Sequence, residues 1–261
     1  ADARPSPSPS SVNMIDIHEG YDLTRMTTFG LKAGCGRLIE YDNADDLATL
    51  YESGMLADVL PIGSGSNMLF VSPRYDGTVL HCRSAHMEFS APDAKGRVVC
   101  TAAAGVTLDD LCREACARGL WGIENLSGIP GEVGGASVQN VGAYGTEWKD
   151  VAVEIRSFDT ATGRTISLSN ADCSYGYRDS MFKHLDGPGS LIVYEAVLEL
   201  STRPQPVLSY AALQKAFGDS EPQTLTPEVL RQEVIALRDA KLPSPAQTGS
   251  AGSFFKNPVV S

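Results

Sequence analysis

Two glycine-rich segments carry the first chemical signal in the sequence. Residues 63–67 read Gly-Ser-Gly-Ser-Asn and follow a short apolar run at 59–62. Consecutive small residues let several backbone N–H groups converge on one anion, and serine and asparagine side chains add further donors. The segment therefore indicates a phosphate-binding turn, with a plain turn between two strands as the alternative. Its spacing differs from GxGxxG and no helix is predicted after it, which excludes a Rossmann fingerprint.

The second segment spans residues 121–145 and shows neither a helical nor a strand period. We expect a long loop without secondary structure, a feature that usually serves function in a compact domain. Gly128, Gly131 and Gly134 recur every third residue and allow the backbone to approach a flat or phosphorylated ligand closely. The alternative is a loop that only needs unusual dihedral angles. Together, the two segments favour a dinucleotide that is held from two sides.

Two further segments contain side chains suited to catalysis. In residues 175–180, Arg178 stands between aromatic side chains and could be held rigidly to stabilise negative charge, with a surface ion pair to Asp179 as the alternative. Ser253 lies in the glycine-rich run 249–257 and could be a nucleophile, a proton donor or a turn residue. No GxSxG elbow surrounds it and no histidine is placed as its base, which disfavours a serine hydrolase. A serine hydroxyl can still donate a proton in a transition state.

Composition narrows the classes of function. The 261-residue chain has 43% hydrophobic and 20% charged residues, which is ordinary for a globular protein. Its net charge of −11 argues against nucleic-acid binding, because neutralising phosphates needs a basic face. The six cysteines and four histidines lack metal-ligand spacing, so we expect no metal site. We interpret the cysteines as reduced thiols of a cytoplasmic protein, and we expect no membrane insertion and no signal peptide.

The surrounding pattern predicts an α+β chain that would hold these segments in place. Asn43, Thr107 and Thr226 are suited to cap three of its helices. The predicted helices cover 43–54, 107–118, 210–217 and 227–239. The predicted strands cover 37–41, 59–62, 78–82, 97–104, 151–159, 165–169 and 191–200. A turn is expected at 75–77, a linker at 201–210 and the start of a further strand at 254–261.

The ordered set of motifs resembles one enzyme family. Thr-Thr-Phe-Gly at 27–30, the two glycine-rich segments, the run 175–183 and the run 241–258 follow one another as in UDP-N-acetylmuramate dehydrogenases, the MurB family. The resemblance extends from about Asp22 to the last residue. It implies an FAD-binding fold of the vanillyl-alcohol-oxidase (PCMH) type, built from two α+β subdomains, with a substrate-binding domain after them. The implied divisions are a flexible Pro/Ser-rich lead at 1–21, FAD-binding subdomains at 22–85 and 86–203, and an incomplete α+β substrate-binding domain at 204–261.

The resemblance also implies a reaction. Members of this family reduce UDP-N-acetylglucosamine enolpyruvate to UDP-N-acetylmuramate, a peptidoglycan precursor, with NADPH as co-substrate. NADPH reduces the noncovalently bound FAD, hydride then reaches the methylene carbon of the enolpyruvyl group, and the adjacent carbon takes a proton. This chemistry needs a cation beside the substrate carboxylate and a positioned acid. By motif match, Arg178 is the cation and Ser253 the proton donor, in a protein expected to act as a monomer.

The remaining site residues come from the same motif match. The residues implied to hold FAD are Gly63, Ser64, Gly65, Ser66, Asn67, Gly128, Ile129, Pro130, Gly131, Gly134, Gly135, Gln139, Asn140 and Tyr144. The residues implied to bind the nucleotide-sugar substrate are Tyr177, Tyr210, Lys241 and Asn257, with Arg238 adding positive charge nearby.

The carboxyl end departs from the family pattern. Family members continue past Asn-Pro-Val-Val-Ser and supply a catalytic glutamate from that tail, whereas this sequence stops at Ser261, so no residue is assigned the role. We expect that the sequence is either a fragment or a protein with a shortened third domain. We also expect such a chain to retain flavin binding more readily than catalytic turnover. Glu124 and Glu132 lie in the flavin loop and are not substitutes. The alternatives are a noncatalytic flavin- or nucleotide-binding module and another FAD oxidoreductase of the same fold, such as an alcohol oxidase.

Overall fold

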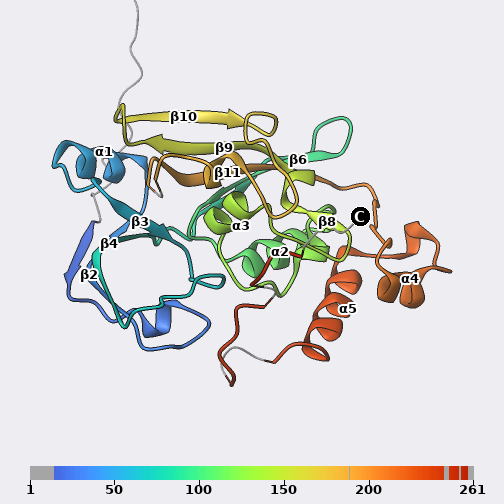
Figure 1. The fold of residues 1–261 in the computed structure, drawn as a ribbon. Coiled ribbons are helices and arrows are strands. Elements are labelled where there is room, and N and C mark those ends of the chain that lie inside the picture. The colour runs from blue at the N-terminus through green and yellow to red at the C-terminus, as the bar shows by residue number, and fades with distance from the viewer. Residues whose placement is uncertain (1–14, 188, 244–246, 253, 258–261) are drawn as a thin grey trace, which may run out of the picture.

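The N-terminal part of the chain forms a four-stranded sheet in the order β1-β2-β4-β3, coloured blue to teal in Figure 1. The computed structural model describes residues 15–187, 189–243, 247–252 and 254–257. β1 pairs antiparallel with β2, whereas β4 lies parallel to both β2 and β3. The strands are β1 (Asp16–Glu19), β2 (Gly34–Tyr41), β3 (Val59–Ile62) and β4 (Arg74–Cys82).

Helix α1 (Ala44–Glu52) carries the chain from β2 to β3. It begins at Asn43, whose side chain accepts hydrogen bonds from the backbone N–H groups of Asp45 and Asp46. This satisfies two of the N–H groups that a helix start leaves unpaired. The crossover returns the chain to the same sheet, so that β3 ends beside β4 and delivers the first glycine-rich segment at that edge.

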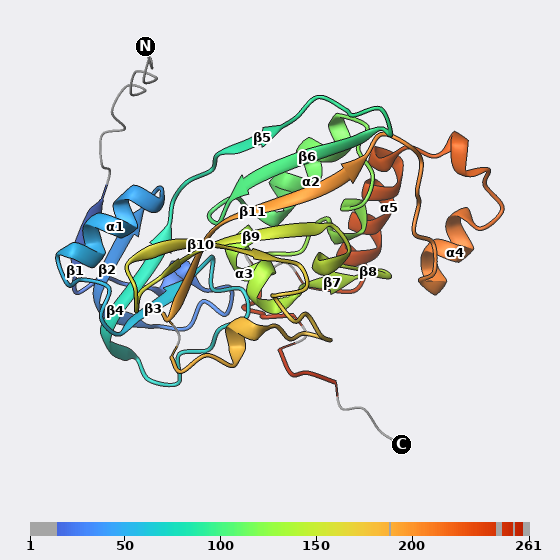
Figure 2. The same cartoon turned by 90° about the horizontal axis from the view of Figure 1, so that it is seen from above.

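The middle of the chain forms an antiparallel five-stranded sheet in the order β10-β9-β11-β6-β5. Helices α2 (Leu108–Ala117) and α3 (Val133–Gln139) cover one of its faces, as the two views show (Figures 1 and 2). A small hairpin, β7 (Gly142–Ala143) with β8 (Thr146–Glu147), follows α3. The strands of the large sheet are β5 (Met87–Phe89), β6 (Arg97–Ala103), β9 (Ala152–Asp159), β10 (Arg164–Ser169) and β11 (Leu191–Ser201).

Two α-helices lie in the described part of the chain after β11. They are α4 (Ala211–Phe217) and α5 (Pro227–Asp239); Figure 2 shows α5 beside α2 and α4 farther out, beyond the end of the large sheet. Leu213 of α4 and Leu230 of α5 form a buried cluster with Trp121, the first residue of the second glycine-rich segment. Burial of these apolar side chains holds α5 against the middle of the chain. Short 3-10 helices lie at Thr24–Met26, Glu124–Leu126, Trp148–Asp150, Met181–Lys183 and Pro222–Thr224.

The two sheets share a hydrophobic core. Leu47 and Leu50 of α1 pack in one buried cluster with Phe158 of β9 and Ile192 of β11. Because this cluster contains side chains from both sheets, the loops at their facing edges are held in a fixed relation. The functional site is built from these loops.

Most predicted elements are confirmed, and the N-caps are among them. The Thr107 side chain accepts a hydrogen bond from the N–H of Asp110, and the Thr226 side chain accepts one from the N–H of Val229. The α+β class is also confirmed, as is the linker between β11 and α4. All six cysteines lie within the described ranges, where they are buried free thiols. None of the helices in those ranges combines the length and apolar character that crossing a bilayer requires.

Four local predictions are wrong. Residues 16–19 form β1 against β2, so they do not belong to the flexible lead at 1–21. The expected turn at 75–77 lies inside β4, where a register shift between Cys35 and Arg37 accommodates Gly36 close to the Asp76 carbonyl. Residues 254–257 form no strand, and 258–261 lie outside the described residues. The segment 121–145 contains helix α3, where the sequence predicted none.

Candidate active site

One large cavity lies where the two glycine-rich segments meet. Its volume is about 820 Å³, within the usual range for small-molecule sites. The first wall is the end of β3 with the loop that follows it (residues 61–68), and the second comes from residues 128–144. Further wall residues come from the 178–193 region and from the end of α5 and the chain after it. The cavity therefore joins the two sheets and α5 at a single space.

The first glycine-rich segment lines the cavity with all five predicted residues, Gly63 to Asn67. Gly65 has a φ of +54°, and a Cβ there would overlap the carbonyl oxygen of Met26. Glycine is thus required for the loop to bend at this point. The Oγ atom of Ser64 is buried and has no hydrogen-bond partner among the described residues. An unpaired buried hydroxyl beside a turn of small residues fits a ligand with phosphate oxygens.

The second segment closes onto the first. Gly131 has a φ of +138°, and a Cβ at this residue would lie 3.0 Å from the Ser66 Oγ. Gly134 lies in the first turn of α3, where a Cβ would come within 3.0 Å of the Ala104 Cβ. The glycines therefore let the segment pack against β6 and the first loop at once. Its lining residues among those predicted are Gly128, Ile129, Pro130, Gly131, Gly134, Gly135, Gln139 and Tyr144.

Asn140 differs from the other predicted cofactor residues because it does not line the cavity. It is fully buried, has a φ of 45° and ends α3 in the left-handed conformation. Its Nδ2 donates a hydrogen bond to the Gly176 carbonyl at 2.7 Å, and its Oδ1 accepts one from the N–H of Lys149 at 3.0 Å. The side chain thereby fixes the hairpin that carries the catalytic candidate Arg178.

Arg178 lines the cavity from a tight turn. Gly176 and Asp179 exchange backbone hydrogen bonds across this turn, and Arg178 occupies its third position with a φ of 53°. Glycine or asparagine is the usual residue there, so an arginine in this strained position indicates a functional demand. Its Nη2 donates a hydrogen bond to the Gly142 carbonyl, and its Nη1 lies 3.6 Å from the Glu147 carboxylate. The expected alternative, an ion pair with Asp179, is not what the structure shows, because Asp179 contacts His184 and Lys256.

The predicted substrate residues divide into two groups. Tyr210 lines the cavity, packs against Tyr144 at a ring distance of 4.9 Å, and lies under the Lys241 ammonium at 5.4 Å. Tyr177, Lys241 and Asn257 are exposed and do not line it. Ser253 lies outside the described residues, while Ala251 and Gly252 line the cavity.

Helix α5 contacts the second glycine-rich segment at the backbone of Gly128. The N–H of Gly128 donates a hydrogen bond to Asp109 Oδ1 at 2.6 Å, and the Gly128 carbonyl accepts one from Arg238 Nε at 3.0 Å. Arg231 holds Asp109 with two hydrogen bonds, of 2.6 and 3.0 Å. Burial lowers the pKa of Arg238, which remains a cation, and this residue also lines the cavity. Residues from α2 and α5 thus fix the position of a glycine that faces the ligand space.

Several residues of the cavity wall were not predicted from the sequence. Tyr41, Cys82 and Glu132 line the cavity, and burial raises the pKa of Cys82 to about 11. Tyr41 and Cys82 end predicted strands, so an expectation that strand ends border the site could have found them. Glu132 contacts His81, which lies more than 50 residues earlier in the sequence, and no local sequence pattern predicts such a contact.

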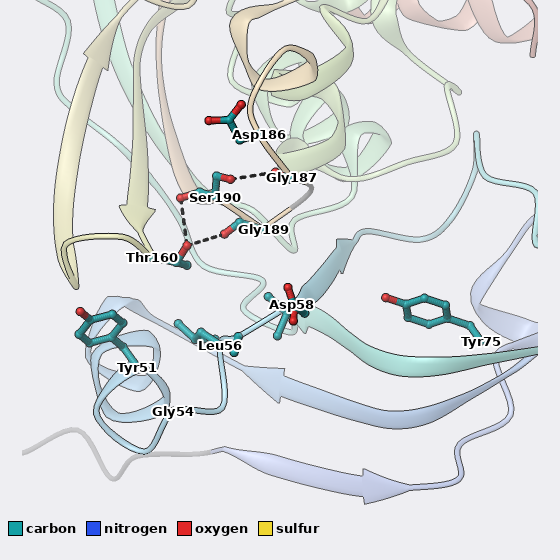
Figure 3. A pocket seen from close by; sticks show the side chains of 12 residues that line it. Tyr51, Gly54, Leu56, Asp58, Tyr75, Thr160, Asp186, Gly187, Gly189 and Ser190 are labelled. Atoms are coloured by element: carbon teal, nitrogen blue, oxygen red, sulfur yellow. Dashed lines mark hydrogen bonds between the residues drawn. The ribbon is translucent and has the colours of Figure 1, made fainter.

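A second cavity of about 540 Å³ lies between the loop after α1 and the turn that follows β9 (Figure 3). Its walls include Tyr51, Asp58, Thr160 and Asp186, and its described lining contains no lysine, arginine or histidine. Two carboxylates without a cation disfavour a phosphorylated ligand. The first cavity is therefore the site that fits a dinucleotide.

Replacing Asp109 with alanine tests the link between α5 and the cofactor loop. We expect a loss of about 1–3 kcal/mol in the free energy of unfolding, because the guanidinium of Arg231, only 8% exposed, would lose its carboxylate partner. Urea denaturation measures the change. Asp110→Ala is the matched control, since its ion pair with Arg113 is exposed and is expected to contribute less than about 0.5 kcal/mol. Equal losses in both variants would contradict the assignment.

Comparisons with known proteins agree with this geometry. The family model described as an FAD binding domain matches residues 38–169. The UDP-N-acetylenolpyruvoylglucosamine reductase of Neisseria meningitidis serogroup A is 42% identical over 245 residues, covering 92% of this chain and 69% of the relative. That of Bacteroides fragilis (strain YCH46) is 38% identical over 245 residues, covering 94% of this chain and 72% of the relative.

A solved structure gives the same result. The crystal structure of UDP-N-acetylenolpyruvylglucosamine reductase (MurB) from Thermus caldophilus matches with a TM-score of 0.66 at 27% identity, covering 95% of this chain and 76% of that chain. The resemblance inferred from the motifs and the FAD-binding fold are both confirmed. The chain belongs to the UDP-N-acetylenolpyruvoylglucosamine reductase family.

Proposed function

We propose that this chain is an FAD-dependent reductase that converts UDP-N-acetylglucosamine enolpyruvate into UDP-N-acetylmuramate at the expense of NADPH, in peptidoglycan precursor synthesis. Family membership supports the reaction. The observation that carries the proposal is the single cavity of about 820 Å³ in which both glycine-rich segments, Arg178 and Tyr210 face one space. A redox cofactor and a charged substrate can thereby be held in contact.

The first glycine-rich segment is proposed to bind the diphosphate of FAD noncovalently. Its backbone N–H groups and the unpaired Ser64 hydroxyl suit phosphate oxygens. Gly128, Ile129, Pro130 and Gly131 line the cavity and are proposed to contact the flavin ring system. Bound FAD, once reduced by NADPH, supplies the hydride for the enolpyruvyl group. The protein contributes position, charge and a proton.

Arg178 is proposed to stabilise the charge that develops on the substrate carboxylate. Two main-chain carbonyls, of Asn140 and Gly142, accept hydrogen bonds from its guanidinium, which fixes the side chain before substrate arrives. A preorganised cation lowers the barrier because it need not reorient as negative charge accumulates. Glu147, 3.6 Å from Nη1, limits the net positive charge when no substrate is present.

Ser253 is proposed to donate the proton to the carbon next to the reduced methylene. Its neighbours Ala251 and Gly252 line the same cavity as Arg178, which supports the assignment. Tyr210 and Lys241 are proposed to bind the substrate diphosphate, since the Lys241 ammonium lies beside the Tyr210 ring and 3.4 Å from its hydroxyl. Tyr177 and Asn257 complete the proposed set as outer contacts.

We further infer that the chain acts as a monomer in the cytoplasm. The cavity is built from one chain, and the six buried free thiols are in keeping with a reducing compartment.

Half-reaction spectroscopy tests the proposed activity. The purified protein should be yellow, lose its colour anaerobically when NADPH is added, and regain it when the enolpyruvyl nucleotide sugar follows. Absorbance near the flavin band reports each step. Colour that returns only with oxygen would identify a flavin-binding protein without reductase activity, and a colourless protein that takes up no FAD would contradict the cofactor assignment.

Arg178→Lys should slow the second half-reaction by roughly 10- to 100-fold and leave bleaching by NADPH unchanged. Lysine keeps the charge but cannot bond two carbonyls while presenting a planar fork to a carboxylate. Stopped-flow absorbance separates the two steps. Arg164→Lys, an exposed arginine on β10, is the matched control and should react as the wild type does. A normal second step in Arg178→Lys would reduce Arg178 to a structural residue.

Ser253→Ala should likewise preserve reduction by NADPH and slow recolouring by roughly 10²–10⁴-fold, the usual contribution of a positioned acid. The same stopped-flow assay measures it. An equal loss in both half-reactions would show that the serine holds the site together instead of donating a proton.

A further inference from the structure

A row of four titratable side chains, in which two histidines alternate with two glutamates, runs from the protein surface to the cavity wall. Both Glu132 carboxylate oxygens lie 3.3 Å from His81 Nε2, and His81 Nδ1 lies 3.3 Å from Glu40 Oε1. The other oxygen of Glu40 lies 3.4 Å from His18 Nε2. His18 is 43% exposed, whereas the side chains of His81 and Glu132 are 16% and 9% exposed. Burial therefore increases along the row, and Glu132 is its innermost member.

Strand register places this row beside the proposed phosphate site. His81 pairs with Glu40 of β2 on one side and with Ile62 of β3 on the other. Ile62 is the last residue of β3, so the first glycine-rich segment begins next to His81. A Cβ added at Gly63 would lie 3.0 Å from Glu132 Oε2. The Glu132 carboxylate thus lies against the first residue of the segment that is proposed to bind the FAD diphosphate.

A buried carboxylate at an anion site needs compensation. An ionised Glu132 would repel a diphosphate bound at Gly63–Asn67, because the two negative charges would interact through a medium of low dielectric constant. Among the described residues, the cation that contacts Glu132 is His81. No lysine or arginine of those residues forms an ion pair with it. The charge state of one imidazole therefore decides how much of the Glu132 charge the cavity experiences.

The surroundings of His81 favour its charged form. Burial lowers the pKa of His81, but the hydrogen bonds and charges of Glu132 and Glu40 outweigh burial and raise that pKa above its ordinary value. Tyr41 and Cys82, which face the same wall, remain neutral, because burial raises their pKa values, that of Cys82 to about 11.

The other charged groups lie at the far end of the row. Beyond Glu40, Arg83 contacts Asp16 and Asp42 and keeps its charge throughout. The strand β3, on the other side of His81, contributes no titratable side chain.

We propose that His81 is a positioning residue for the cofactor: its imidazolium neutralises Glu132 and so allows the FAD diphosphate to bind at residues 63–67. The inference rests on the proposed function, since it takes FAD as the ligand of this cavity. Because the neutralising charge is lost when His81 releases its proton, FAD affinity should fall as pH rises through the raised pKa of this histidine. Binding should correspondingly take up protons on the alkaline side of that pKa.

The dissociation constant of FAD, measured by flavin fluorescence quenching on cofactor-free full-length chain from about pH 6 to about pH 9, tests this. In the wild type we expect affinity to fall by about tenfold or more across the range. His81→Gln should bind with the weak affinity of the wild type's alkaline limb at every pH. In His81→Gln/Glu132→Gln the tight affinity should return, because the charge that needed neutralising is gone. His86→Gln, an exposed histidine, is the matched control and should follow the wild type.

Each result has a distinct meaning. A wild type that binds no FAD at any pH would contradict the proposed function itself. A wild type that binds FAD with an affinity independent of pH, or a double variant as weak as His81→Gln, would overturn the role of His81 and leave the function intact. Should His81→Gln fail to fold, Glu132→Gln alone decides: its FAD affinity should stay tight across the pH range, and an affinity that falls with rising pH as in the wild type would overturn the inference.

Discussion

The contact between Gly131 and Ser66 is the constraint on which the rest of the site depends. These residues belong to segments about 65 positions apart, on loops of two different sheets, and the close approach uses a glycine with a φ of +138°, where a Cβ would lie 3.0 Å from the Ser66 Oγ. The shared core of Leu47, Phe158 and Ile192 holds the sheets in the relation that allows this contact. If either sheet were displaced, the two loops would no longer enclose one cavity. Packing between the sheets thus determines whether the ligand cavity can form.

An acidic protein needs positioned cations around a cavity that binds anions. The chain has a net charge of −11, so an anionic cofactor and substrate must be attracted by a few positioned cations. Arg178 is fixed by main-chain carbonyls, Arg238 by the Gly128 carbonyl, and His81 by two carboxylates. Each is held by groups that do not belong to the ligand. Preorganisation of this kind limits the entropy that binding costs.

Local sequence signals predicted what depends on local geometry. The N-caps Asn43, Thr107 and Thr226 were recognisable because capping needs only a side chain and the next three N–H groups. The glycine-rich segments were recognisable as ligand loops for a similar reason. Helix α3 was missed because Gly134 and Gly135 disfavour a helix locally, and packing of Gly134 against Ala104 overrides that preference. The row from His18 to Glu132 could not be predicted from the sequence, since it depends on pairing between strands that are distant in sequence.

The proposed chemistry requires that FAD occupy the cavity between the two glycine-rich segments. Amide hydrogen exchange on the chain with and without FAD tests it most directly, because exchange reports protection residue by residue. We expect slower exchange at residues 63–67 and 128–135 and unchanged exchange at residues 54–58, which border the second cavity. Protection confined to residues 54–58, or none at either glycine-rich segment, would contradict it.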